Sequence, residues 1–201
     1  GYKHEALEMA IQDFEKFCVV FFRKAIEKDI QAIGITDYFS IDNYRKVKEF
    51  VKEIDSSDQF DISEKEKIKE IFLLPNVELR ILPATGSGGL INIHCIFNPN
   101  DTFIESLEHD FFSSLQDSDG NKMNRTGLIT LGKASDEGLS NEEAYKRGVE
   151  EFHLEPSKMI ELFKKKPTLK NNTIIIVSNS NSDGASALQQ HYKLFENENG
   201  S

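Results

Sequence analysis

The clearest strand signal in the sequence is residues 90–97 (LINIHCIF), in which apolar and polar side chains alternate. A period of two places successive residues on opposite faces of a strand. The apolar neighbours of His94 therefore predict a strand that is at least half buried. Because a buried imidazole is costly unless a polar group bonds to it, we expect His94 to have a partner.

Short apolar segments elsewhere predict further strands. Residues 32–37 (AIGITD) form an apolar run that ends in polar residues, which is typical of a buried parallel strand. Pro75 restricts the second strand, because proline is confined to the start or the edge of a sheet strand. The five expected strands span residues 32–36, 71–79, 91–97, 127–132 and 173–177.

Apolar residues at three- and four-residue spacing predict helices between these strands. Capping boxes at Ser63/Glu66 and at Ser140/Glu143 predict the starts of two of them. The other expected helices span residues 3–29, 42–54, 103–115, 157–165 and 185–195. Helices that alternate with short apolar strands predict an α/β fold, with a mainly parallel sheet and flanking helices.

Length and composition limit the class of protein. The 201 residues suit one domain over residues 1–201. Acidic residues outnumber basic ones 34 to 24, so the net charge of −10 does not support binding of nucleic acid or nucleotide, although a local basic patch stays open. The longest apolar run, residues 17–22, is far shorter than the roughly 20 residues of a membrane span. With two cysteines and no signal-peptide pattern, we expect a cytoplasmic protein without a membrane partner.

Four polar residues stand where strands carry functional groups. Asp37 and Glu78 end two expected strands, His94 lies inside a third, and Asp183 follows the last. Functional groups of parallel α/β folds gather at the carboxyl ends of strands, and carboxylates with histidine are suitable ligands for Zn or Mn. The spacing alone favours a structural histidine and ordinary carboxylates at strand ends over a metal site.

Three segments in this order carry a resemblance to a known family. Residues 32–38 (AIGITDY), 74–79 (LPNVEL) and 93–97 (IHCIF) resemble the "GITDH", "PGxE" and "HxF" strands of the PHP (polymerase and histidinol phosphatase) superfamily. More narrowly, the chain resembles the N-terminal PHP-like region of TrlF-like bacterial proteins, which continue into an AAA- or SMC-type ATPase. The segments that carry this narrower resemblance are residues 34–40, 78–80, 92–94 and 180–184.

The resemblance implies a fold, an activity and a set of site residues. The superfamily has a distorted (β/α)7 barrel, a cluster of up to three metals and phosphoesterase activity. Glu78 and His94 match metal-ligand positions, and Asp37 matches the acidic residue of "TDH". These three are the catalytic candidates, and Asp183 is a further candidate ligand near the last motif of the family. Zn or Mn is the implied cofactor.

The sequence also departs from the family pattern. Tyr38 stands where the family has a histidine ligand, and a neutral phenol binds metals poorly. The opening His-x-His strand is missing, no histidine follows Asp183 within two residues, and no Walker motif is present. We therefore expect an incomplete or distorted PHP-type barrel that belongs to a larger protein and binds Zn or Mn weakly or not at all.

Two interpretations of function stay open. In the first, the chain is a PHP-like domain of a larger bacterial ATPase-associated protein, non-catalytic or impaired, whose partner is the C-terminal ATPase region. The resemblance then implies a role in nucleic-acid metabolism or defence against phage. In the second, the chain is an active metal-dependent phosphoesterase that hydrolyses phosphodiesters or phosphomonoesters. The small number of firm metal ligands in the sequence favours the first interpretation.

Overall fold

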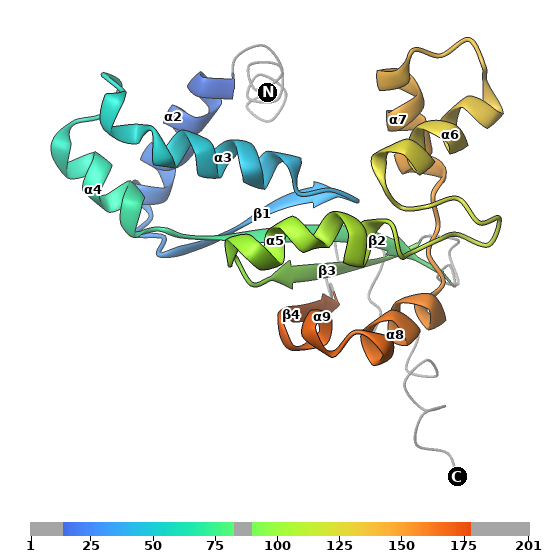
Figure 1. The fold of residues 1–201 in the computed structure, drawn as a ribbon. Helices are drawn as coiled ribbons and strands as arrows, with labels where there is room; N and C mark the ends of the chain where they lie inside the picture. Colours follow the sequence, from blue (N-terminus) through green and yellow to red (C-terminus); the bar gives the residue numbers. More distant parts are fainter. Residues whose placement is uncertain (1–13, 83–89, 178–201) are drawn as a thin grey trace. The chain divides into compact units, whose positions relative to one another are not determined.

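The computed structural model describes residues 14–82 and 90–177, which form helices and a four-stranded sheet (Figure 1). Three features expected from the sequence lie outside the described residues: a turn at residues 83–89 (PATGSGG), the helix at 185–195 and the candidate ligand Asp183. Contacts between Cα atoms divide the chain into two compact units. Of the described residues, 14–35 and 41–74 form unit 1, and 36–40, 75–82 and 90–177 form unit 2.

Unit 1 consists mainly of three helices whose apolar sides pack together. They are α2 (Phe14–Glu27), α3 (Asp42–Lys52) and α4 (Ile62–Glu70), with the short helix η1 (Ile54–Ser56) after α3. The ring of Phe22 stacks on Phe50 at 6.0 Å, and Phe50 meets Phe60 edge to face. The start of α4 is not at Ser63 as the sequence predicted, because Asp61 and Glu64 form the capping box instead.

The sheet contains four strands in the order β1-β2-β3-β4. Their bounds are β1 (Ala32–Tyr38), β2 (Phe72–Ile81), β3 (Ile91–Phe97) and β4 (Thr173–Val177). Strands β1 and β2 run in the same direction (Figure 1), but β2 pairs with β3, and β3 with β4, in antiparallel register. The prediction of a mainly parallel sheet is therefore wrong, and the sheet is mixed.

The reason lies in the connection between β2 and β3. Residues 82–90 separate the two strands. A parallel crossover needs about a dozen residues or more, usually with a helix, whereas antiparallel neighbours can be joined by a short turn. The α/β class is confirmed.

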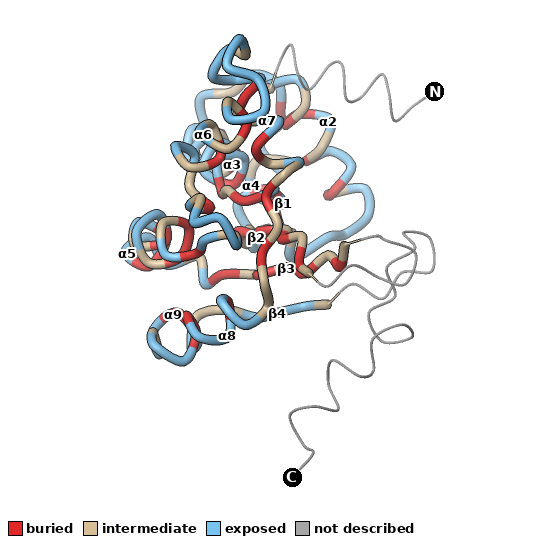
Figure 2. Tube along the Cα trace, turned by 90° about the vertical axis from the view of Figure 1, so that its right-hand side faces the viewer, coloured by how far each residue is buried: buried red, intermediate tan, exposed pale blue. Residues whose placement is uncertain are grey.

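Helices α5, α8 and α9 of unit 2 lie on one side of β2, β3 and β4 (Figure 2). Phe97 of β3 packs against Phe103 of α5 (Asp101–Leu107) and, at 5.0 Å, against Phe111 of the π-helical segment η2 (Glu108–Phe112). Phe111 also approaches Phe163 of α8 (Pro156–Lys165), at 6.4 Å between ring centroids. The short helix α9 (Pro167–Asn171) then leads into β4.

A strand was expected at residues 127–132, and this prediction is wrong because the segment lies inside helix α6 (Arg125–Ser135). The side chain of Asn124 accepts a hydrogen bond from the backbone N–H of Gly127, which caps the helix. Short apolar runs do not distinguish a strand from a buried helix by periodicity alone. The start of the next helix, α7 (Asn141–Glu151), is confirmed, with Ser140 and Glu143 as its capping box.

Helices α6 and α7 pack closely because each helix has a glycine that lies against the backbone of the other helix. A Cβ on Gly132 would lie 1.9 Å from the backbone oxygen of Ala144. A Cβ on Gly148 would lie at the same distance from the backbone oxygen of Leu128.

Among the described helices, none is long and apolar enough to cross a membrane.

Candidate functional site

One face of β2 and β3 carries polar side chains, and we call it the polar face. Alternation along the two strands forms it, and the register places Glu78 opposite His94 and Arg80 opposite Asn92. The polar residues of this face on β2 and β3 are Asn76, Glu78, Arg80, Asn92 and His94.

The opposite face of the same strands is apolar and packs against helices. Val77 and Leu79 of β2 and Ile93 and Cys95 of β3 are buried there, with Phe97 on the same side. Since α5, α8 and α9 lie on one side of these strands (Figure 2), the apolar face is the one that they cover. Except for the buried Asn76, the polar residues of the polar face are half-buried.

Asn76 joins β1 to β3 across the polar face. Its Nδ2 donates to Oγ1 of Thr36 at 2.7 Å and lies 3.1 Å from Nδ1 of His94. An amide nitrogen only donates, so Nδ1 of His94 accepts, and the neutral ring carries its hydrogen on Nε2. The expected polar partner of His94 therefore exists, and it is an amide rather than a carboxylate.

The amide of Asn76 is itself incompletely satisfied. The side chain is only 8% exposed, and Oδ1 has no hydrogen-bond partner within the described residues. Buried polar atoms in native proteins are nearly always bonded, so an unpartnered one needs an explanation, such as strain, a functional role or a bound water or ion. The nitrogen of the same amide lies 3.1 Å from Nδ1 of His94, within the candidate site.

Glu78 and His94 lie opposite each other in the register, but no hydrogen bond or ion pair joins them within the described part of the chain. Both side chains are half-buried. The two firm ligand candidates therefore share one face of the sheet, with the carboxylate of Glu78 and Nε2 of His94 left for other partners among the residues that the structure describes.

Asp37 lies on the other face of the sheet. Along β1, Thr36 reaches Asn76 on the polar face, so alternation turns the next residue away. The exposure pattern agrees, because Asp37 is buried, whereas Thr36 and Tyr38 are exposed. The structure thus brings Glu78 and His94 together and separates Asp37 from them.

Arg80 and Tyr38 form a second feature of the polar face. The guanidinium carbon of Arg80 lies 4.7 Å from the centre of the Tyr38 ring. This is a cation–π distance, and such a contact restricts the position of the guanidinium. Sequence reasoning missed this pair. Polar residues at alternate positions of β2, namely Asn76, Glu78 and Arg80, are the signal that would have found the face.

The donor set of the polar face does not fit a multinuclear metal cluster. Among residues 14–82 and 90–177, no group of three or more His, Cys, Asp or Glu side chains is placed to hold a metal ion. Burial raises the pKa of the Cys95 thiol to about 12, so it provides no thiolate. In addition, the positive charge of Arg80 lies over the ring of Tyr38.

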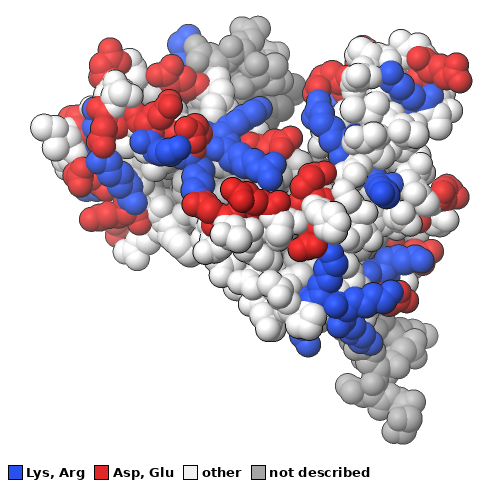
Figure 3. All heavy atoms as spheres, viewed as in Figure 1, with Lys and Arg blue, Asp and Glu red and all other residues white. Residues whose placement is uncertain are grey.

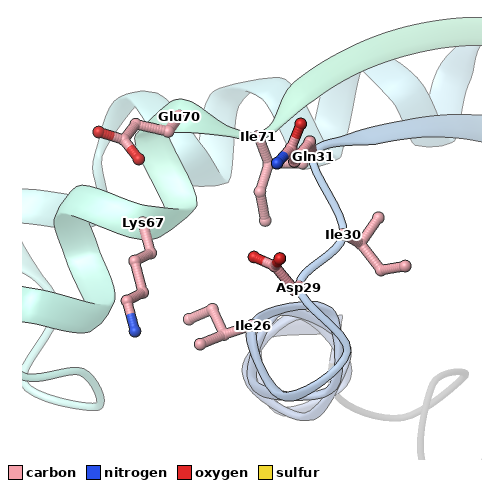
Figure 4. Close-up of a pocket in the computed structure, with 7 residues that line it drawn as sticks. All are labelled: Ile26, Asp29, Ile30, Gln31, Lys67, Glu70 and Ile71. Carbon is pink, nitrogen blue, oxygen red and sulfur yellow. The ribbon is translucent and has the colours of Figure 1, made fainter.

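Unit 1 contains a separate hollow of about 500 Å³ between the ends of α2 and α4 (Figure 4). Ile26, Asp29 and Ile71 face one another in it, and Lys67 borders it. Gln31 and Ile71 also line it, and they precede β1 and β2, so the hollow lies at the amino ends of these strands. Ligands of α/β folds bind at the carboxyl ends, which makes the polar face the better candidate.

Charge is spread rather than gathered on the surface shown in Figure 3, where acidic and basic side chains are interspersed. Basic side chains collect near the end of α8, where Lys164 and Lys165 occupy the last turn. Cations at that position favour the helix dipole, which is a structural reason for their presence.

Known proteins provide no further guide to this site. No protein-family model, no curated protein and no solved structure matches the chain. Function is therefore inferred from the polar face and from the residues that carry the resemblance.

Proposed function

We propose that this chain is a PHP-like α/β module, with an incomplete PHP-type barrel, of a larger bacterial ATPase-associated protein in the cytoplasm. It binds a nucleotide or a partner on the polar face, and it does not hydrolyse a bound nucleotide efficiently. One observation carries the proposal: Glu78 and His94 share a face of the sheet from which Asp37 is turned away. A role in nucleic-acid metabolism or phage defence, with the ATPase region as partner, follows from the resemblance.

Ligand number supports the non-catalytic form of the proposal. Catalytic Zn sites take three protein ligands, and clusters of several metals take more. The polar face supplies one carboxylate and one imidazole, and Nδ1 of that imidazole already accepts from Asn76. A Zn or Mn ion held by this pair alone would be bound weakly.

The second candidate is an active metal-dependent phosphoesterase. The observation in its favour is that Glu78 and His94 are half-buried, lie directly opposite each other and have the donor types that Zn and Mn accept. In this alternative, both residues are metal ligands and further ligands come from elsewhere in the natural protein.

A hydrolysis assay separates the two candidates. The chain is incubated with p-nitrophenyl phosphate and bis-p-nitrophenyl phosphate in the presence of Mn²⁺ or Zn²⁺. We expect no turnover above that of the matched Glu78→Gln and His94→Ala variants. Turnover that both substitutions abolish would establish the phosphoesterase in place of the non-catalytic module.

A further inference from the structure

Arg80 differs from the other arginines of this acidic chain. The sequence contains five, at positions 23, 45, 80, 125 and 147. Four of them lie within 4.0 Å of a carboxylate oxygen, in the pairs Arg23–Glu64, Arg45–Asp42, Arg125–Glu142 and Arg147–Glu151. Arg80 makes no ion pair and its guanidinium makes no hydrogen bond within the described residues.

Comparison with Arg125 shows what is particular to Arg80. The guanidinium of Arg125 also lies over a tyrosine, at 4.5 Å from the centre of the Tyr145 ring, but it forms an ion pair with Glu142 at 2.8 Å as well. In Arg80 the contact with the Tyr38 ring positions the guanidinium and leaves its N–H donors for another acceptor. A guanidinium positioned in this way is suited to a planar or tetrahedral oxyanion.

The position of the pair in the sheet agrees with ligand binding. Tyr38 is the last residue of β1, and Arg80 is the last but one of β2, so both lie at the carboxyl ends of two strands that run in the same direction (Figure 1). The half-buried Asn92 lies directly opposite Arg80 and brings a side-chain amide to the same place. Carboxyl ends of neighbouring strands are the usual ligand position in open α/β sheets.

We propose that Arg80, held by Tyr38 and flanked by Asn92, is a metal-free binding site for a phosphate group. The positive charge that a metal would supply to a phosphate comes here from the guanidinium, through charge-assisted hydrogen bonds to the phosphate oxygens. This inference rests on the proposed function, because it names the chemical group that the non-catalytic polar face recognises.

The effect of Glu78 on phosphate binding distinguishes a metal-free site from a metal-mediated one. Glu78 lies two residues from Arg80 on the same strand face, at about 7 Å along the strand. At a metal-free site the carboxylate repels phosphate, so Glu78→Gln strengthens binding, by about threefold for charges at this distance in water. At a metal-mediated site the same substitution removes a ligand and weakens binding.

The experiment is a titration of the full chain with inorganic phosphate in the presence of EDTA, at constant ionic strength, followed by ¹H–¹⁵N NMR of the arginine Nε–Hε groups. We expect the resonance of Arg80 to shift and the other arginines to stay in place. Arg80→Gln weakens binding about tenfold, since charge-assisted pairs are the strong ones. Tyr38→Ala weakens phosphate binding less than Arg80→Gln does, and Tyr38→Phe leaves it unchanged. Arg125→Gln is the matched control and leaves binding unchanged.

The outcomes separate the two proposals. EDTA-resistant binding that Arg80→Gln does not weaken would overturn the assignment of Arg80 and leave the non-catalytic module standing. Binding that needs added Mn²⁺ and that Glu78→Gln weakens would overturn the proposed function as well. If no arginine resonance moves in the wild-type chain, the phosphate site is wrong. A parallel titration with AMP identifies the source of the phosphate, because tighter binding of AMP indicates a nucleotide and equal binding indicates free phosphate.

Discussion

The side-chain nitrogen of Asn76 lies 3.1 Å from Nδ1 of His94 and 2.7 Å from the hydroxyl oxygen of Thr36. One buried amide therefore links three strands of the sheet at its polar face.

Replacement of Asn76 by leucine removes this link. His94 then loses its partner in a half-buried position, and an unsatisfied group of this kind costs about 1–3 kcal/mol, whereas the exposed Thr36 can bond to water instead. We expect urea denaturation to show a loss of unfolding free energy in this range. Asn98→Ala is the control, because Asn98 bonds Asn172 in an exposed position. Equal losses in the two variants would contradict the role of Asn76.

The tautomer of His94 follows from the same contact. With Nδ1 as acceptor, the neutral imidazole carries its hydrogen on Nε2. The ¹⁵N chemical shifts of the ring, measured above the pH at which the imidazole loses its charge, distinguish the two tautomers. A ring with its hydrogen on Nδ1 would contradict this orientation and would leave Nε2 ready to bind a metal.

The residues of β3 and β4 explain why part of the fold was predictable. Residues 91–97 and 173–177 were both expected as strands, and the structure gives the same bounds. In β3 the alternation of the sequence agrees with the alternation of buried and half-buried side chains, whereas β4 is a short apolar run between polar residues whose three isoleucines are exposed. At residues 127–132 the apolar pattern was ambiguous, and the cap at Asn124 together with the packing of Gly132 against Ala144 selects a helix.

The candidate site was less predictable than the strands. Glu78 and His94 were both named from the sequence, but their register depends on antiparallel pairing of β2 with β3, whereas a mainly parallel sheet was expected. The contacts of Asn76 with Thr36 and of Arg80 with Tyr38 depend on which strand lies beside β2. Strand order is a long-range property that local sequence patterns do not contain.

The tight packing of α6 on α7 gives a prediction about the fold of unit 2. In Gly132→Ala the new Cβ would overlap the backbone of Ala144, which cannot move like a flexible side chain. Overpacking of this kind costs about 1–3 kcal/mol. Thermal unfolding should show a clear loss of unfolding free energy for Gly132→Ala. It should show little loss for Gly138→Ala, whose Cβ would meet only the side chain of Asp136, at 3.2 Å. Equal stability of the two variants would contradict the packing of these helices.

High pH should destabilise the chain through its buried thiols. Burial raises the pKa of Cys95 from its ordinary value of 9.0 to about 12, and burial with the nearby charge of Glu15 does the same for Cys18. Above the ordinary value the unfolded chain loses thiol protons that the folded chain retains, so the unfolding free energy is constant below about pH 9 and falls as the pH rises toward about 12. Cys95→Ala should reduce this slope in denaturation curves. An unchanged slope would contradict the raised pKa.

The metal content of the purified chain tests the central claim most directly. The polar face offers one carboxylate and one imidazole, while Asp37 is turned to the other face. We expect elemental analysis after loading with Mn²⁺ or Zn²⁺ and gel filtration in chelator to find less than one metal ion per chain. Two or more ions per chain that survive the chelator would contradict the account and make the metal-dependent phosphoesterase the leading interpretation.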